Sequence, residues 1–138
     1  MRPTKSPTRS ERSIPAVTAS AAAADALLIM VFAAIGRDAH ARGDVITGVL
    51  LTAWPFLAGA AVTWLLLRLW REPLALWPAG VAVWLGTVGV GMALRALTGQ
   101  TVVLPFVIVA LISLAVLLLG YRALVLGFLR LRRSRRRD

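Results

Sequence analysis

Four long apolar runs occupy most of this chain of 138 residues and restrict what it can fold into. They span about 16–36, 45–67, 74–97 and 102–126. Each is long enough to cross the hydrocarbon core of a bilayer as an α-helix, which takes about 17–25 residues. A soluble domain of this size could not bury so much apolar surface, since 59% of its residues are hydrophobic. The sequence therefore predicts an all-α integral membrane protein.

The joins between these runs are short, and this predicts how the spans are arranged. Helices joined by few residues become antiparallel neighbours, so we expect an antiparallel, up-down four-helix bundle over residues 16–129. The N-terminal tail, residues 1–15, is rich in Pro, Ser, Thr and Arg and has little to bury. We therefore expect it to be disordered. Residues 130–138 form an arginine-rich C-terminal tail.

Basic residues are distributed unevenly along the chain, and their positions indicate topology. Of 16 Lys and Arg residues, four lie before the first span, two in the second join and seven at the C-terminal side, making 13 on one side of an even number of spans. Only Arg37, Arg42 and Arg95 lie on the other side. Because Lys and Arg accumulate in cytoplasmic loops, we predict a multi-pass protein of the plasma membrane with both termini in the cytoplasm.

The net charge of +10 also bears on partners. The basic residues flank membrane spans and form no recognition motif, so we expect anionic lipids at the two tails and no nucleic acid. The chain has no cysteine and one histidine, which argues against a metal site or another cofactor. Paired carboxylates and phosphate-binding loops are also lacking, so we do not expect an enzyme.

Asp25 is the one acidic residue within a predicted span. An ionised side chain near the bilayer centre costs about 2.5–3.5 kcal/mol on insertion scales, so it needs a partner. Asp25 lies ten residues after Pro15, and Arg122 lies eight residues before Arg130. At 1.5 Å per residue these positions are about 15 Å and about 12 Å from the cytoplasmic edge. We predict that Asp25 pairs with Arg122, with Arg68 as the competing cation.

Two interpretations of this pair remain open. A buried ion pair often fixes the register of helices, which favours a structural or accessory membrane protein. The alternative is a small proton-coupled transporter or channel in which Asp25 binds the proton or another cation.

A second polar cluster is predicted at the external side, where Arg37 and Arg95 lie near the same interface. These arginines could bind an anionic headgroup or solute. His40 titrates near neutral pH and could sense pH or relay protons. The plainer alternative is a solvated loop with arginines that extend toward the interface.

The third span carries a stripe of small residues at spacings of three and four. In lipid, helices associate where small side chains let their backbones approach closely, so this stripe predicts a helix-packing seam. Its partner is either another span or a second copy of the chain, so a homo-oligomer is possible. A sliding or gating surface is the functional alternative. The seam comprises Ala79, Ala82, Gly86, Gly89 and Ala93.

Several short motifs, in order across the four spans, resemble those of a family of small membrane proteins catalogued as domain of unknown function 3054. The likeness covers about residues 22–123 and leaves out both basic tails. It implies a four-span membrane protein and supplies no activity. It draws attention to the polar positions Asp25, Arg37, His40, Arg95 and Arg122. The motifs are Asp25, Phe32, Gly36-Arg37, His40, Trp54-Pro55-Phe56, Gly59, Gly91, Leu94-Arg95 and Gly120-Tyr121-Arg122.

Overall fold

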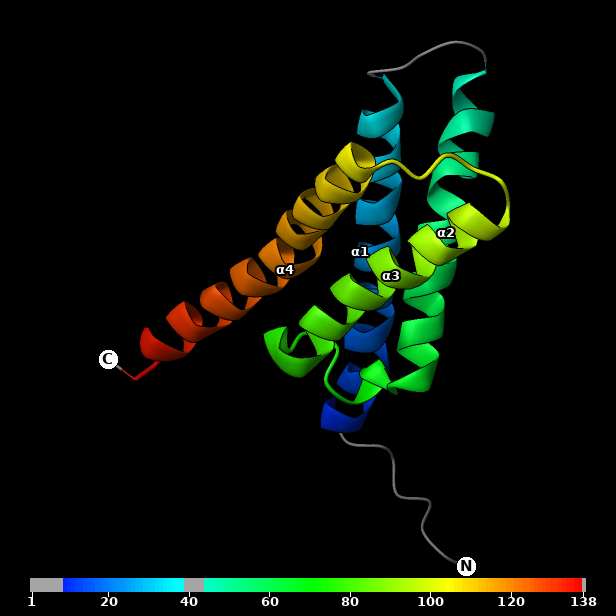
Figure 1. The fold of residues 1–138 in the computed structure, drawn as a ribbon. Helices are drawn as coiled ribbons and strands as arrows, with labels where there is room; N and C mark the ends of the chain where they lie inside the picture. Colours follow the sequence, from blue (N-terminus) through cyan, green and yellow to red (C-terminus); the bar gives the residue numbers. More distant parts are fainter. Residues whose placement is uncertain (1–8, 39–43, 138) are drawn as a thin grey trace, which may run out of the picture.

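The computed structural model describes residues 9–38 and 44–137, and every regular element in these ranges is helical (Figure 1). The elements are α1 (Arg9–Asp38), α2 (Val45–Leu66), η1 (Leu69–Arg71), η2 (Leu76–Gly80), α3 (Val81–Leu97) and α4 (Leu104–Ser134). Four segments are long and apolar enough to cross a membrane: Pro15–Arg37, Val45–Leu66, Leu76–Leu97 and Leu104–Ser134. The prediction of an all-α chain with four such helices is confirmed.

The first and last helices, α1 and α4, extend into the two basic tails. α1 begins at Arg9, so residues 9–15 are helical where we expected disorder. Arg and Glu are good helix formers, and these residues continue a helix that the apolar segment already nucleates. α4 likewise continues to Ser134, inside the arginine-rich tail. Residues 1–8 lie outside the described part of the chain, so the expectation of disorder there stays a prediction.

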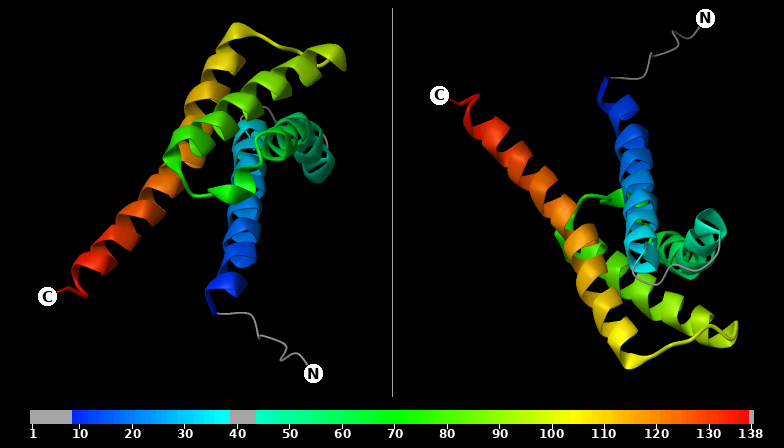
Figure 2. Two further views of the ribbon diagram at one scale, coloured as in Figure 1. Left: turned by 90° about the horizontal axis from the view of Figure 1, so that it is seen from below. Right: turned by 90° about the horizontal axis from the view of Figure 1, so that it is seen from above.

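The four long helices cross one another obliquely. Figure 2 shows α2 almost end-on, whereas α1, α3 and α4 are seen along much of their length. α1 packs against α2, α2 against α3, α3 against α4, and α1 also against α4. The helices therefore do not share the nearly common axis of a regular four-helix bundle. Oblique crossings are typical where small residues bring two helices together at one point.

One such close approach joins α2 to α3 at Gly59. A Cβ atom added to Gly59 would lie 3.0 Å from the carbonyl oxygen of Thr87 and 3.1 Å from that of Gly86. It would also lie 3.1 Å from the backbone nitrogen of Gly91. Because all three neighbours are backbone atoms, no side chain can move aside to make room. Gly59 therefore sets how closely these helices pack.

The predicted small-residue seam faces its neighbours only in part. Ala79 is buried, and Gly86 packs against Thr63 of α2. Gly89 and Ala93 are exposed, and an added Cβ at Gly89 would meet nothing within 4 Å. Spacings of three and four fit several faces of one helix, so the small residues alone did not identify the packed face. The buried residues of α3 are Val83, Thr87, Val88 and Gly91.

The third span does not begin as a regular helix. Trp77 has extended backbone angles, φ −124° and ψ 132°, inside η2. The residue before a proline is pushed out of the helical region, and Pro78 follows Trp77 directly. This break lets Gly80 lie against α4, where its added Cβ would be 3.1 Å from Cδ of Arg122. The connection between α2 and α3 is thereby placed beside Arg122 of α4.

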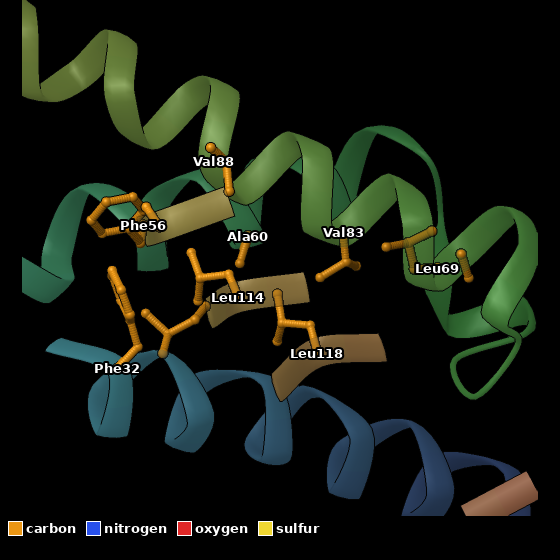
Figure 3. Close-up of a cluster of buried hydrophobic side chains, with 11 residues drawn as sticks. Phe32, Phe56, Ala60, Leu69, Val83, Val88, Leu114 and Leu118 are labelled. Atoms are coloured by element: carbon orange, nitrogen blue, oxygen red, sulfur yellow. The ribbon is translucent and has the colours of Figure 1, made fainter. Parts of the chain in front are cut away.

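Side chains from all four long helices meet in one apolar core. Figure 3 shows Phe32 of α1, Phe56 of α2, Val83 of α3 and Leu114 of α4 directed into this shared space. The rings of Phe32 and Phe56 meet edge to face with centroids 5.5 Å apart. Phe56, Val83 and Leu114 have no exposed surface. The core thus holds the helices in place around the polar residues that the apolar segments also bury.

Candidate functional site

The buried charges of the spans form one ion pair between α1 and α4. Nη1 of Arg122 donates to Oδ1 of Asp25 at 2.7 Å, and Nη2 donates to Oδ2 at 2.9 Å. Asp25 is 1% exposed and Arg122 has no exposed surface. This is the two-pronged geometry in which a guanidinium binds a carboxylate most strongly. The structure therefore contains the predicted Asp25–Arg122 pair.

Two further donors complete the surroundings of Asp25. The hydroxyl of Tyr121 donates to Oδ1 at 2.9 Å, and the indole Nε1 of Trp64 donates to Oδ2 at 2.9 Å. Each carboxylate oxygen therefore accepts two hydrogen bonds. An ionised carboxylate offers about four lone-pair positions, and all of them are used here. Asp25 is held as a fully hydrogen-bonded carboxylate.

Arg122 is bound through most of its remaining donors. Its Nε donates to the carbonyl oxygen of Pro73 at 3.1 Å, and Nη1 also donates to the carbonyl oxygen of Leu118 at 3.0 Å. The guanidinium carbon lies 4.8 Å from the centre of the Tyr121 ring. We call this set of residues the Asp25 cluster. It joins α1, α2, α4 and the connection between α2 and α3. Its members are Asp25, Trp64, Tyr121, Arg122 and the carbonyl group of Pro73.

Arg68, the competing cation in the sequence prediction, does not pair with Asp25. α2 ends at Leu66, and Arg68 lies in the turn beyond it with left-handed backbone angles, φ 50° and ψ 50°. The residue is exposed. The reversal of the chain after α2 therefore places Arg68 outside the core, and Trp64, one turn earlier, takes the position beside Asp25.

The other predicted cluster lies at the opposite ends of the helices. Arg37 and Arg95 line one groove of about 640 Å³, whereas His40 lies outside the described residues. Nη2 of Arg37 donates to the carbonyl oxygen of Asp44 at 3.2 Å. Nη1 of Arg95 donates to Oε1 of Gln100 at 2.8 Å. The structure thus brings two of the three predicted external residues into a common site.

Asp44 fixes the start of α2 beside this groove. Its carboxylate accepts hydrogen bonds from the hydroxyl and from the backbone N–H of Thr47. These bonds, with smaller contributions from Ile46 and the positive charge of Arg37, lower the pKa of Asp44 below its usual value. Asp44 is therefore an ionised helix cap near neutral pH.

Three members of the Asp25 cluster were missed by the sequence analysis, namely Trp64, Tyr121 and the carbonyl group of Pro73. Trp64 lies three residues before the end of the predicted second span, so counting along the helix places it about 5 Å from the interface and well short of the depth of Asp25. Tyr121 immediately precedes Arg122. A search for hydrogen-bond donors at the depth of Asp25 would have proposed Tyr121 as a candidate but not Trp64. The Pro73 carbonyl gave no such signal, because the path of a turn cannot be deduced from spacing.

A family model described as "Protein of unknown function (DUF3054)" matches residues 22–125. The chain belongs to the DUF3054 family. This match confirms the resemblance drawn from the sequence motifs. The DUF3054 segment contains every residue of the Asp25 cluster and both groove arginines, Arg37 and Arg95. No curated protein and no solved structure matches the chain significantly.

Proposed function

We propose that this protein is a structural or accessory component of the plasma membrane whose helices are held together by the Asp25–Arg122 pair. The spans run antiparallel in this proposal, with both termini in the cytoplasm, as the bias of positive charge favours. The protein has no catalytic role, because one histidine and no cysteine leave few groups for catalysis.

The observation that carries this proposal is the complete hydrogen bonding of Asp25. Its four hydrogen bonds come from Arg122, Tyr121 and Trp64, on two other helices. Removing one partner of a buried ion pair typically costs about 3–5 kcal/mol, because the other charge is left uncompensated. The pair therefore makes the arrangement of α1 relative to α4 specific.

The transporter alternative is supported less well by this geometry. A proton or cation needs an acceptor lone pair, and each oxygen of Asp25 already accepts two hydrogen bonds. A transport cycle would have to break at least one of these bonds in every turnover. Asp25 is better suited to holding a fixed partner.

Anionic lipids are the proposed partners of the C-terminal end of α4. Arg130, Arg133 and Arg137 gather there around Ser134. Basic residues beside a membrane span contribute about 1 kcal/mol each to binding an anionic bilayer surface. The same residues would hold this end at the cytoplasmic face.

A double-mutant cycle tests the structural proposal. The free energy of unfolding in detergent is compared for wild type, Asp25→Asn, Arg122→Gln and the double variant. Each single change should cost about 3–5 kcal/mol, and the double variant should recover a large part of the loss. Arg130→Gln is the matched control, because Arg130 is an exposed arginine of the same helix. The free energy of unfolding of this variant should differ little from that of wild type.

Additive losses in this cycle would contradict a coupled structural pair. A second measurement separates the transporter alternative. Purified wild-type protein in liposomes should leave an imposed pH gradient intact. A gradient that wild type dissipates and Asp25→Asn preserves would instead establish Asp25 as a proton site.

A further inference from the structure

A groove open to the surroundings lies at the ends of the helices remote from Asp25. Its volume is about 640 Å³. Arg37 is the last residue of the first span, Arg95 lies two residues before the end of the third, and Phe106 lies in the first turn of the fourth. The groove therefore lies at one membrane interface, at the level where headgroups meet acyl chains.

The walls of this groove are mainly apolar. Phe32 of α1, together with Phe106 and Val109 of α4, lines it. Beneath them Phe56 has no exposed surface, and its ring centroid lies 6.3 Å from that of Phe106. Such a surface favours a hydrocarbon chain over a small hydrated solute.

Arg95 supplies a positive charge at this apolar site. Its guanidinium carbon lies 4.5 Å from the centre of the Phe106 ring. Its hydrogen-bond acceptors, Oε1 of Gln100 and the carbonyl oxygen of Thr101, are both neutral. Its Nε is buried and has no acceptor within the described part of the chain. No carboxylate of the described residues forms a salt bridge with Arg95. A partly desolvated cation of this kind attracts an anion.

Arg37 brings a second guanidinium to the same groove. It lies across Gly48 of α2, where an added Cβ atom would be only 1.8 Å from Cζ of Arg37. The absent side chain of Gly48 thus gives Arg37 its place in the groove. Asp44 lies close to Arg37 and reduces its net positive field, so Arg95 remains the main uncompensated charge.

We propose that this groove binds an anionic phospholipid of the surrounding leaflet. The phosphate is held by Arg95, with Arg37 adding positive charge, and one acyl chain lies along Phe32, Phe106 and Val109. Guanidinium groups bind phosphate through paired hydrogen bonds, which accounts for the headgroup. The apolar walls account for binding of the acyl chain. The position of the groove at the interface explains why one molecule would supply both an anionic headgroup and an acyl chain.

Photocrosslinking in nanodiscs tests this proposal at the resolution of the site. The protein is embedded in phosphatidylcholine with a trace of phosphatidylglycerol that carries a diazirine in its acyl chain, and crosslinked peptides are mapped by mass spectrometry. Crosslinks should concentrate at the end of α1 and the start of α4. Excess unlabelled phosphatidylglycerol should displace them, whereas excess phosphatidylcholine should not.

Two variants connect this labelling to the groove. Arg95→Gln should lower crosslinking at the groove about tenfold, the loss expected for a charge-assisted contact, while labelling near Leu66 at the other interface stays unchanged. Val109→Trp keeps both arginines and fills the groove, and it should reduce the same crosslinks. Arg71→Gln is the matched control, since Arg71 is an exposed arginine of η1, at the other ends of the helices.

Four results would overturn the proposal. Crosslinks spread evenly over the lipid-facing surface would mean that the groove is not a site. Equal displacement by phosphatidylcholine would remove the role of net negative charge. Stronger labelling of the groove by a diazirine fatty acid than by the phospholipid would make a fatty acid the occupant. Loss of the lipid crosslinks when two copies of the chain associate through the groove would make a second copy the occupant.

Discussion

Two indole N–H groups of this protein donate to acceptors of different charge. Nε1 of Trp64 donates to the carboxylate of Asp25, and Nε1 of Trp84 donates to the carbonyl oxygen of Leu111, both at 2.9 Å. Hydrogen bonds to charged groups contribute about 1.5–3 kcal/mol, and those between neutral groups about 1 kcal/mol. The two tryptophans therefore offer a direct comparison of what a buried charge adds to one bond.

We predict that Trp64→Phe destabilises the protein by about 1 kcal/mol more than Trp84→Phe does. Both substitutions remove the same atoms, so the effects of lost volume largely cancel. The charge of the acceptor is then the main difference between the two variants. Free energies of unfolding in mixed detergent micelles measure the difference. Equal losses, or a larger loss for Trp84→Phe, would show that Trp64 contributes little to holding Asp25.

At this scale the sequence predicted the pair itself but not the residues around it. Depth along a helix follows from counting residues, and that counting placed Asp25 and Arg122 at the same level. Which neighbouring helix a side chain points toward depends on how the helices are rotated about their own axes. The contributions of Tyr121 and Trp64 depend on that rotation, so depth alone did not reveal them.

Among the elements, α2 and α3 each contain a glycine that suits a comparison, because the surroundings of Gly59 and Gly89 differ sharply. A Cβ atom added to Gly59 would press against three backbone atoms of α3, whereas one added to Gly89 would meet nothing within 4 Å. Both lie in helices, where alanine is favoured over glycine by about 1 kcal/mol. The same substitution at the two positions therefore separates packing from helix propensity.

We predict that Gly59→Ala destabilises the protein by about 1–3 kcal/mol, because α3 must move away from α2. Gly89→Ala should be neutral or stabilising, by up to about 1 kcal/mol. Thermal unfolding in detergent compares the two variants with wild type. A stable Gly59→Ala protein would mean that the contact between α2 and α3 is looser than its geometry indicates.

The third span shows where sequence patterns lose their predictive value for an element. Its length and hydropathy predicted a helix correctly, but its small residues indicated a face that includes the exposed Gly89 and Ala93. The face that is buried was selected by Gly59 and Phe56 on the neighbouring helix. Such selection depends on two elements together, so a pattern within one of them does not contain it.

For the whole molecule, the orientation in the membrane can be measured with single cysteines, because the chain has none of its own. We predict that Thr98→Cys, in the turn after α3, reacts with a membrane-impermeant maleimide in intact cells. Ser134→Cys, at the end of α4, should react only after the cells are permeabilised. The reverse pattern would contradict cytoplasmic termini, and labelling of both sites in intact cells would indicate two orientations.

The number of spans was predictable because each depends on its own composition, and hydropathy over about 20 residues determines it. The oblique crossing of the helices was not, since short joins determine only which helices are neighbours. Crossing angles follow from the shapes of the two surfaces in contact. In this protein those surfaces include the close approach at Gly59, which the sequence shows only as one glycine among 11.

The distance along the chain between the two buried charges has a consequence for biosynthesis. Asp25 and Arg122 are 97 residues apart, so the ribosome delivers the acid with the first helix and its partner with the last. Until then the acid lacks its counter-ion, and a chain that stops short of α4 never acquires it. The ion pair thereby distinguishes finished chains from incomplete ones, and a protease that recognises an unsatisfied charge in the bilayer would remove only the latter.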